Sequence, residues 1–176
     1  MTVGTSQALT FQIRLMAREA AKRSADSATL GSNIAGAGSD SAYLLELLAF
    51  ELLLKATLQI HGVKPPAIYS YSRLFGLLPP GVQRALRDTA ASRVGPDVDF
   101  SKLDRLLDTW GQNFVRLRYP YEKYEGLTGE QYRARGDMWL QNGAEEDAAD
   151  FVYYPEQLHA FTHALQIEVD TWLSGR

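Results

Sequence analysis

Two arginines near the end of a predicted helix are the residues of this sequence best suited to bind an anion. Arg116 and Arg118 lie in Trp110–Glu122 (WGQNFVRLRYPYE), where the helical pattern runs into an Arg-Tyr-Pro stop. On a helical wheel Arg118 falls at the edge of the apolar face, whereas Arg116 points away from it. A guanidinium at the border of a core needs a partner. We expect Arg118 to be mostly buried and to bridge helices, with a phosphate or nucleotide contact as the alternative, and Arg116 to be exposed.

Aromatic and acidic residues follow these arginines directly. Tyr119, Tyr121 and Glu122 are within four positions of Arg118. Tyrosine rings can stack on nucleobases, and they can equally pack around the end of a helix. A ligand site here would therefore include Arg118, Tyr119 and Glu122.

The second apolar segment carries the other charged candidates. Glu51 and Lys55 stand in the favourable i, i+4 order, which predicts an ion pair. Alternatively, Glu51 and Lys55 line a cleft opposite Arg118. Glu46 lies among apolar residues, where a carboxylate is costly unless it is paired, and we expect Arg118 or a second copy of the chain to pair with it.

A metal site has little support in the sequence. His159 and His163 are spaced one helical turn apart, which could chelate a metal, but no further ligand completes the set. The chain has no cysteine, so thiolate sites and disulfides are excluded. We expect neither a metal nor a cofactor.

Apolar periodicity predicts that these groups are carried by helices alone. The expected helices cover, in chain order, 5–30, 40–61, 69–78, 81–93, 102–119 and 155–173. Ser101 is expected to cap the fifth of them. The segment 123–152 is polar and is predicted to be an insertion with a short helix near 130–140. The sequence therefore predicts one all-α domain over 1–176, an antiparallel bundle of four or five helices.

The helix over 40–61 is apolar around most of its circumference. Such a helix belongs in the middle of a bundle or at a subunit interface. We therefore expect a homodimer. The charged residues of this helix argue against a segment that spans a bilayer. The first residues of the sequence have no signal-peptide pattern. We therefore expect a cytoplasmic protein without a membrane partner.

Three segments together resemble the HEPN family, named for nucleotide binding in higher eukaryotes and prokaryotes. Glu51 with Lys55 is similar to the family's glutamate–lysine pair. The run Tyr69–Phe75 (YSYSRLF) looks like its short His-Asp-Leu helix, with Tyr69 in place of the histidine. Arg118–Glu122 resembles its catalytic helix end. The resemblance implies a four- or five-helix bundle that usually dimerises, in a setting such as a prokaryotic defence or toxin–antitoxin system.

The resemblance is incomplete at the position that would do chemistry. Ribonucleases of the family carry an Arg followed four to six residues later by a His, whereas Arg116 is followed at that reach by Tyr121. A phenol has a pKa of about 10 against about 6.5 for imidazole, so it is a poor general base at neutral pH. The net charge of −3 also means that any nucleic-acid site must be a local patch.

Three hypotheses for the function follow. The leading one is a non-catalytic or degenerate HEPN-like module that binds RNA, a nucleotide or a cognate protein partner. The second is a metal-independent ribonuclease with a non-standard site formed by Arg118, Arg116 and Tyr121. The third is a purely structural bundle that mates with another protein.

Overall fold

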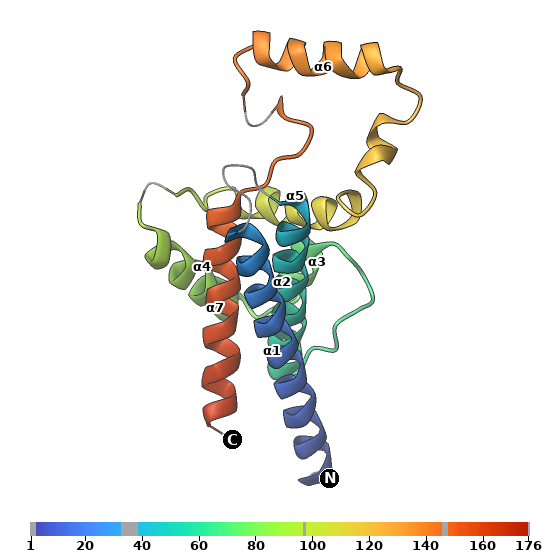
Figure 1. Cartoon of the computed structure of the whole chain (residues 1–176). Helices are drawn as coiled ribbons and strands as arrows, with labels where there is room; N and C mark the ends of the chain where they lie inside the picture. The colour runs from blue at the N-terminus through green and yellow to red at the C-terminus, as the bar shows by residue number, and fades with distance from the viewer. Residues whose placement is uncertain (1–2, 33–38, 97, 146–147, 176) are drawn as a thin grey trace.

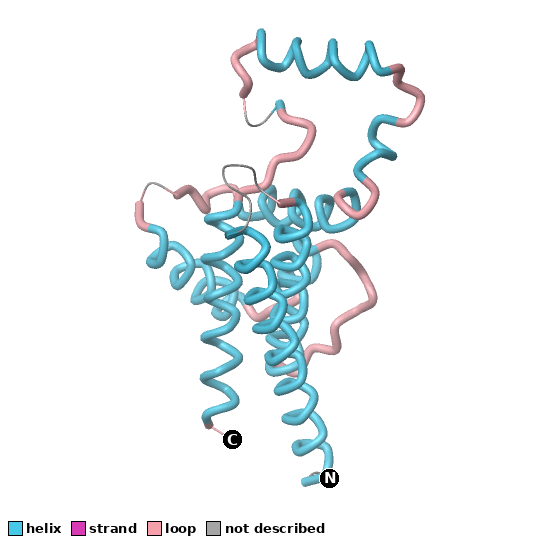
Figure 2. The backbone as a smooth tube through the Cα atoms, viewed as in Figure 1, coloured by secondary structure: helices cyan, strands magenta, loops and turns pink. Residues whose placement is uncertain are grey.

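The chain folds entirely into helices and loops in the part that the structure describes (Figure 1). The computed structural model describes residues 3–32, 39–96, 98–145 and 148–175. Figure 2 shows helices and connecting loops, with no strand in these ranges. The all-α prediction is confirmed. In chain order the elements are α1 (Val3–Ser32), α2 (Asp40–Ile60), α3 (Tyr71–Gly76), α4 (Pro80–Val94), α5 (Leu103–Arg116), the 3-10 helix η1 (Pro120–Tyr124), α6 (Gly129–Gln141) and α7 (Pro155–Ser174).

Helix α2 lies in the middle of the bundle. It begins where the Ser39 hydroxyl accepts a hydrogen bond from the backbone N–H of Ala42 at 3.3 Å, and it ends before Gly62, whose φ of 76° suits a residue without Cβ. It packs against α1, α3, α5 and α7. The large exposed apolar side chains of the described ranges all lie outside α2. One chain thus covers this helix by itself, so its apolar surface gives no support to the predicted homodimer. No helix in these ranges has the length and hydropathy of a bilayer span.

The three long helices do not all alternate in direction. α1 runs antiparallel to α2, because Ser27 near its end bonds to Ala42, whereas Met16 lies beside Gln59. α7 runs parallel to α2, because Glu46 pairs with His159 at one end and His61 pairs with Glu168 at the other. The expectation of a uniformly antiparallel bundle is therefore wrong for this pair of helices. The long segment between α5 and α7 leaves the bundle, and α7 then begins at the end of the bundle where α2 also begins (Figure 1).

The core is organised around one phenylalanine of α7. The ring of Phe161 is fully buried, and four other aromatic rings lie within van der Waals reach of it. The distances between ring centroids are 6.3 Å to Phe50, 5.6 Å to Phe75, 6.0 Å to Phe100 and 6.4 Å to Trp110. Tilted and edge-on ring pairs of this kind add to the stability that burial alone provides.

The polar segment before α7 forms an arm that stands away from the bundle (Figure 1). The short helix expected near 130–140 is present as α6, opened by a capping box in which Thr128 and Gln131 bond to each other's backbone N–H groups. None of its residues is buried. The carboxylate of Asp150 ties the two legs of the arm, at 3.2 Å from Lys123 and 2.6 Å from Arg135.

Helix α5 differs from the prediction at both ends. The N-cap position is Lys102 and not Ser101, and no side chain caps the helix. Ser101 is instead held by Asp99, which accepts hydrogen bonds from its backbone N–H at 2.6 Å and from its hydroxyl at 2.8 Å. At the other end α5 stops at Arg116, three residues before the predicted end at Tyr119. Arg118 consequently lies outside the helix, and a helical wheel no longer describes it.

Candidate functional site

A groove lies beside the end of α5, where the chain leaves the bundle for the arm. Its volume is about 530 Å³. Four of the residues that line it are predicted from the sequence as site residues, namely two arginines, one tyrosine and one acid, and three others are not. The lining residues are Tyr69, Val115, Arg116, Arg118, Tyr119, Glu122 and Lys123.

Backbone contact between α5 and the start of α3 shapes this groove. A Cβ added to Gly111 would lie 2.8 Å from the carbonyl oxygen of Tyr69, so only glycine permits this approach. Ser70 then caps α3 by accepting a hydrogen bond from the backbone N–H of Arg73 at 3.4 Å. The ring of Tyr69 is left outside the helix, 5.9 Å from the ring of Phe114. In this way Gly111 and Ser70 place an exposed tyrosine over the end of α5.

Arg118 is exposed, so the prediction that it is mostly buried is wrong. Its Nε donates a hydrogen bond to the carbonyl oxygen of Phe114 at 2.9 Å. The guanidinium carbon lies 4.5 Å from the centre of the Phe114 ring and 5.7 Å from that of Tyr69. None of the carboxylates in the described ranges lies within ion-pair distance of it. The arginine is held in place by aromatic faces and a carbonyl, and its charge remains uncompensated.

The other groove residues give it a positive and aromatic surface. Arg116 is exposed, as predicted. Tyr119 is 54% exposed, and its ring meets edge to face, at a centroid distance of 6.3 Å, the ring of Tyr121, a residue that is 68% exposed and lies outside the lining. Glu122 is the one acidic side chain among the lining residues. Lys123 is occupied by Asp150, so Arg116 and Arg118 are the cations that remain for a ligand.

Glu51 and Lys55 form the predicted ion pair but do not line the groove. The Lys55 Nζ lies 2.5 Å from a carboxylate oxygen of Glu51. The hydroxyl of buried Tyr71 donates to the carbonyl oxygen of Leu47 at 3.3 Å and approaches Glu51 at 3.5 Å. Burial, with the nearby charge of Glu51, raises the pKa of Tyr71 far above its usual range. Tyr71 therefore stays protonated, and this cluster ties α2 to α3.

Glu46 has a different partner from the one predicted. Its carboxylate lies 3.4 Å from Nδ1 of His159 on α7, whereas Arg118 is held by Phe114. His61 pairs with Glu168 at 2.9 Å. The described ranges contain no group of three or more histidines and acids placed to hold a metal ion. The two histidines whose spacing suggested chelation, His159 and His163, therefore lack a third ligand there.

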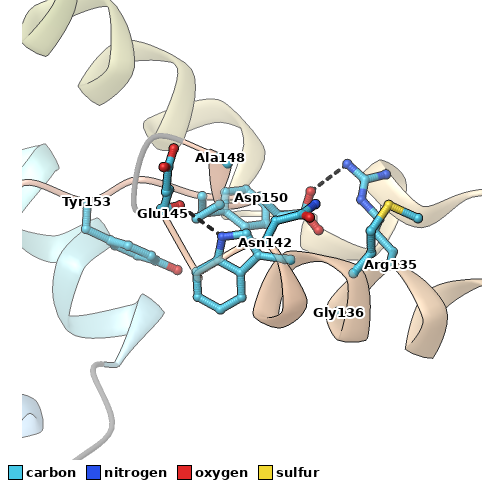
Figure 3. A pocket seen from close by; sticks show the side chains of 11 residues that line it. Arg135, Gly136, Asn142, Glu145, Ala148, Asp150 and Tyr153 are labelled. Carbon is cyan, nitrogen blue, oxygen red and sulfur yellow. Dashed lines mark hydrogen bonds and ion pairs between the residues drawn. The ribbon is translucent and has the colours of Figure 1, made fainter.

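A second hollow lies within the arm, between α6 and the segment that returns to the bundle (Figure 3). The indole N–H of Trp139 donates to the carbonyl oxygen of Glu145 at 2.9 Å, and Arg135 donates to Asp150 at 2.6 Å. Partial burial alone would raise the pKa of Asp150, but hydrogen bonds from Lys123 and Tyr124 and the positive charges of Lys123 and Arg135 outweigh it and lower this pKa. The sequence pattern located α6, but no local signal indicated these partners.

Sequence and structure comparisons name no relative for this groove or this fold. The chain matches no protein-family model, no curated protein and no solved structure. The functional argument therefore rests on the groove and its chemistry.

Proposed function

We propose that the groove at the end of α5 binds single-stranded RNA and that the chain acts as a non-catalytic binding module. The observation that carries this proposal is the exposed, uncompensated guanidinium of Arg118. A guanidinium offers five N–H donors, and the carbonyl of Phe114 uses only the one on Nε. The remaining donors suit the oxygens of a phosphate, which guanidinium groups bind with two parallel hydrogen bonds.

The exposed tyrosines supply what a cationic site alone lacks. Tyr69 and Tyr119 line the groove with the two arginines, and the ring of Tyr121 lies against that of Tyr119. All three tyrosines leave more than half of their surface in solvent. Aromatic faces next to cations are the arrangement by which proteins hold unpaired bases and the phosphates between them. Rings can stack on bases that are unpaired, whereas a duplex keeps its bases stacked on each other, so the groove favours a single strand.

The same residues argue for binding without cleavage. The three histidines of the chain lie at 61, 159 and 163, and none of them lines the groove. His61 and His159 are engaged with acids elsewhere. Tyr121 stands where an imidazole would be needed, and its phenol is a poor base at neutral pH. The proposal extends the resemblance to the HEPN family: the bundle is a degenerate member, and a prokaryotic defence or toxin–antitoxin system is its setting.

Fluorescence anisotropy with a labelled single-stranded RNA of about ten nucleotides tests the proposal. Arg118→Ala is expected to weaken binding by about five- to tenfold and to reduce the slope of log affinity against log salt by about 1. Tyr119→Ala is expected to cost about 1–3 kcal/mol of binding free energy if its ring stacks on a base.

The matched control is Arg84→Ala, which removes an exposed arginine from α4, outside the groove. It should leave the affinity within about twofold, because a single distant surface charge is screened by salt. An equal loss in Arg84→Ala and Arg118→Ala would show that only net charge matters and would refute the site. No binding at low salt would leave the protein-partner hypothesis in its place.

A further inference from the structure

A second cavity lies at the end of the bundle where α7 begins, and it shares no residue with the groove at α5. Its volume is about 470 Å³, within the range of small-molecule sites. The end of α1 and the first turns of α2 and α7 enclose it. The residues that matter for its chemistry are Ser27, Tyr43, Glu46, Tyr153 and His159.

Glu46 is the unusual group in this cavity. It is 4% exposed, yet its ion-pair partner within the described ranges is a single imidazole. The distance of 3.4 Å to Nδ1 of His159 is longer than a good hydrogen bond of this type. The His159 side chain is itself 60% exposed, so it can swing into solvent without crossing a packed core. A buried carboxylate is thus covered by a loosely held imidazole that can move aside.

The other polar groups of the cavity are already committed to partners. The Tyr43 hydroxyl donates to the carbonyl oxygen of Tyr153, and the Tyr153 hydroxyl donates to Asp40 at 2.7 Å. The Ser27 hydroxyl donates to the carbonyl oxygen of Ala42 at 2.7 Å. Recognition of a ligand therefore falls to Glu46, while the remaining wall offers apolar and aromatic surface.

The aromatic wall and the charges favour one class of ligand. The rings of Tyr43 and Tyr153 meet edge to face with centroids 4.9 Å apart. Aromatic faces attract cations and apolar groups alike. The carboxylates in and beside the cavity, Glu46 and Asp40, are both negative when ionised. Among the described residues that line the cavity, a metal ion would find one carboxylate, Glu46, and one imidazole, His159, which is too few for a protein-held site.

We propose that this cavity binds a small organic cation with an apolar body, such as an arylalkyl ammonium. The ammonium group displaces the imidazole of His159 and pairs with the carboxylate of Glu46, while the apolar body lies against Tyr43 and Tyr153. This site is independent of the RNA groove, so either can fail without the other.

Isothermal titration calorimetry on the full chain tests the charge requirement with three probes of similar shape. Phenethylamine is cationic at neutral pH, phenethyl alcohol is neutral and hydrocinnamate is anionic. The amine is expected to bind at least about tenfold more tightly than the alcohol, and the anion is expected not to bind, because only the cation compensates a buried carboxylate. Equal affinity for amine and alcohol would overturn the proposal.

Variants locate the site. Glu46→Gln should weaken amine binding at least about tenfold, because it removes the charge and keeps the shape. His159→Ala should bind the amine as tightly as the wild type or more tightly, since the competing imidazole is gone. Glu168→Gln is the matched control, because it breaks the other Glu–His pair of α7 at 2.9 Å, far from the cavity.

The outcomes separate folding from binding. Circular dichroism establishes that each variant is folded, and the exposed position of His159 makes that variant decisive if Glu46→Gln does not fold. Loss of amine binding in His159→Ala, unchanged binding in folded Glu46→Gln, or an equal loss in Glu168→Gln would each refute the site.

Discussion

Replacing Gly111 by alanine should destabilise the chain, although alanine is the better helix former. Gly111 is buried in α5, and an added Cβ would lie 2.8 Å from the carbonyl oxygen of Tyr69 and 3.5 Å from the backbone nitrogen of Tyr71. Both neighbours are backbone atoms, so no change of rotamer can relieve the first contact. Either α5 or the segment that leads into α3 must move.

Two opposing contributions set the size of the effect. Alanine gains about 1 kcal/mol over glycine inside a helix. An extra carbon in a closely packed place costs about 1–3 kcal/mol, and contact with backbone puts this position in the upper half of that range. The difference is a loss of about 1–2 kcal/mol in the free energy of unfolding.

Urea unfolding followed by far-UV circular dichroism measures this difference. Gly81→Ala in α4 is the matched control, because nothing lies within 4 Å of a Cβ added there. It should raise the free energy of unfolding by about 0.4–1 kcal/mol, since alanine restricts the unfolded chain more than glycine does. If both variants were more stable than the wild type, the close approach at Gly111 and the argument for how the groove is built would be refuted.

Four further results are expected. Arg118→Ala should lower the free energy of unfolding by only about 0.5–1 kcal/mol, because it loses its aromatic contacts, and Arg116→Ala should lower it by less than about 0.5 kcal/mol. Urea unfolding measures both values. A loss above about 3 kcal/mol for Arg118→Ala would indicate a buried arginine. The hydrogen bond to Glu46 raises the pKa of His159 against the smaller opposing effects of burial and of the charge on Arg93. Protonated His159 therefore stabilises the folded state below its unfolded pKa of about 6.5. This stabilisation is lost as the pH rises through the folded pKa. The melting temperatures of wild type and His159→Ala should therefore differ more at pH of about 5.5 than at about 8.5, and equal differences would contradict the pair. Purified protein should leave a labelled unstructured RNA intact at neutral pH without added metal; cleavage that follows the protein peak and vanishes in Arg118→Ala would show an enzyme instead. Light scattering at micromolar concentration should give twice the chain mass of 19.6 kDa if the pairing implied by the family resemblance holds for this chain. A monomer mass would count against the dimer.

Local patterns in the sequence predict the helices well because the signals that start and stop a helix are local. Ser39 supplies the cap of α2, and Pro65 follows its end. The predicted range 40–61 therefore differs from the observed Asp40–Ile60 by one residue. The sequence also predicts that the polar segment before α7 is an insertion outside the core, because its apolar residues are isolated. The exposure of Arg118 was not predictable in this way, since a wheel drawn through it assumes a helix that ends at Arg116.

The partners of charged groups depend on contacts between distant segments. Glu46 and His159 are far apart in the sequence, and nothing in their surroundings marks them as a pair. From the sequence alone, Gly111 is an ordinary helix-destabilising residue. Its role in the close approach to the backbone of Tyr69 becomes clear only from the structure. The sequence predicts Arg116, Arg118, Tyr119 and Glu122 as site residues because they follow one another closely. Tyr69 is distant from them in the sequence, and only the folded structure places it in the groove.

The position of Phe161 in α7 has a consequence for how the chain acquires its structure during synthesis. The rings of Phe50, Phe75, Phe100 and Trp110 all emerge from the ribosome before the one ring that they surround. Until α7 emerges, the preceding helices expose an apolar aromatic surface, to which chaperones can bind and through which the chain can aggregate. The four rings are therefore expected to close around Phe161 only after α7 has been synthesised, and a premature stop before α7 should yield an insoluble product.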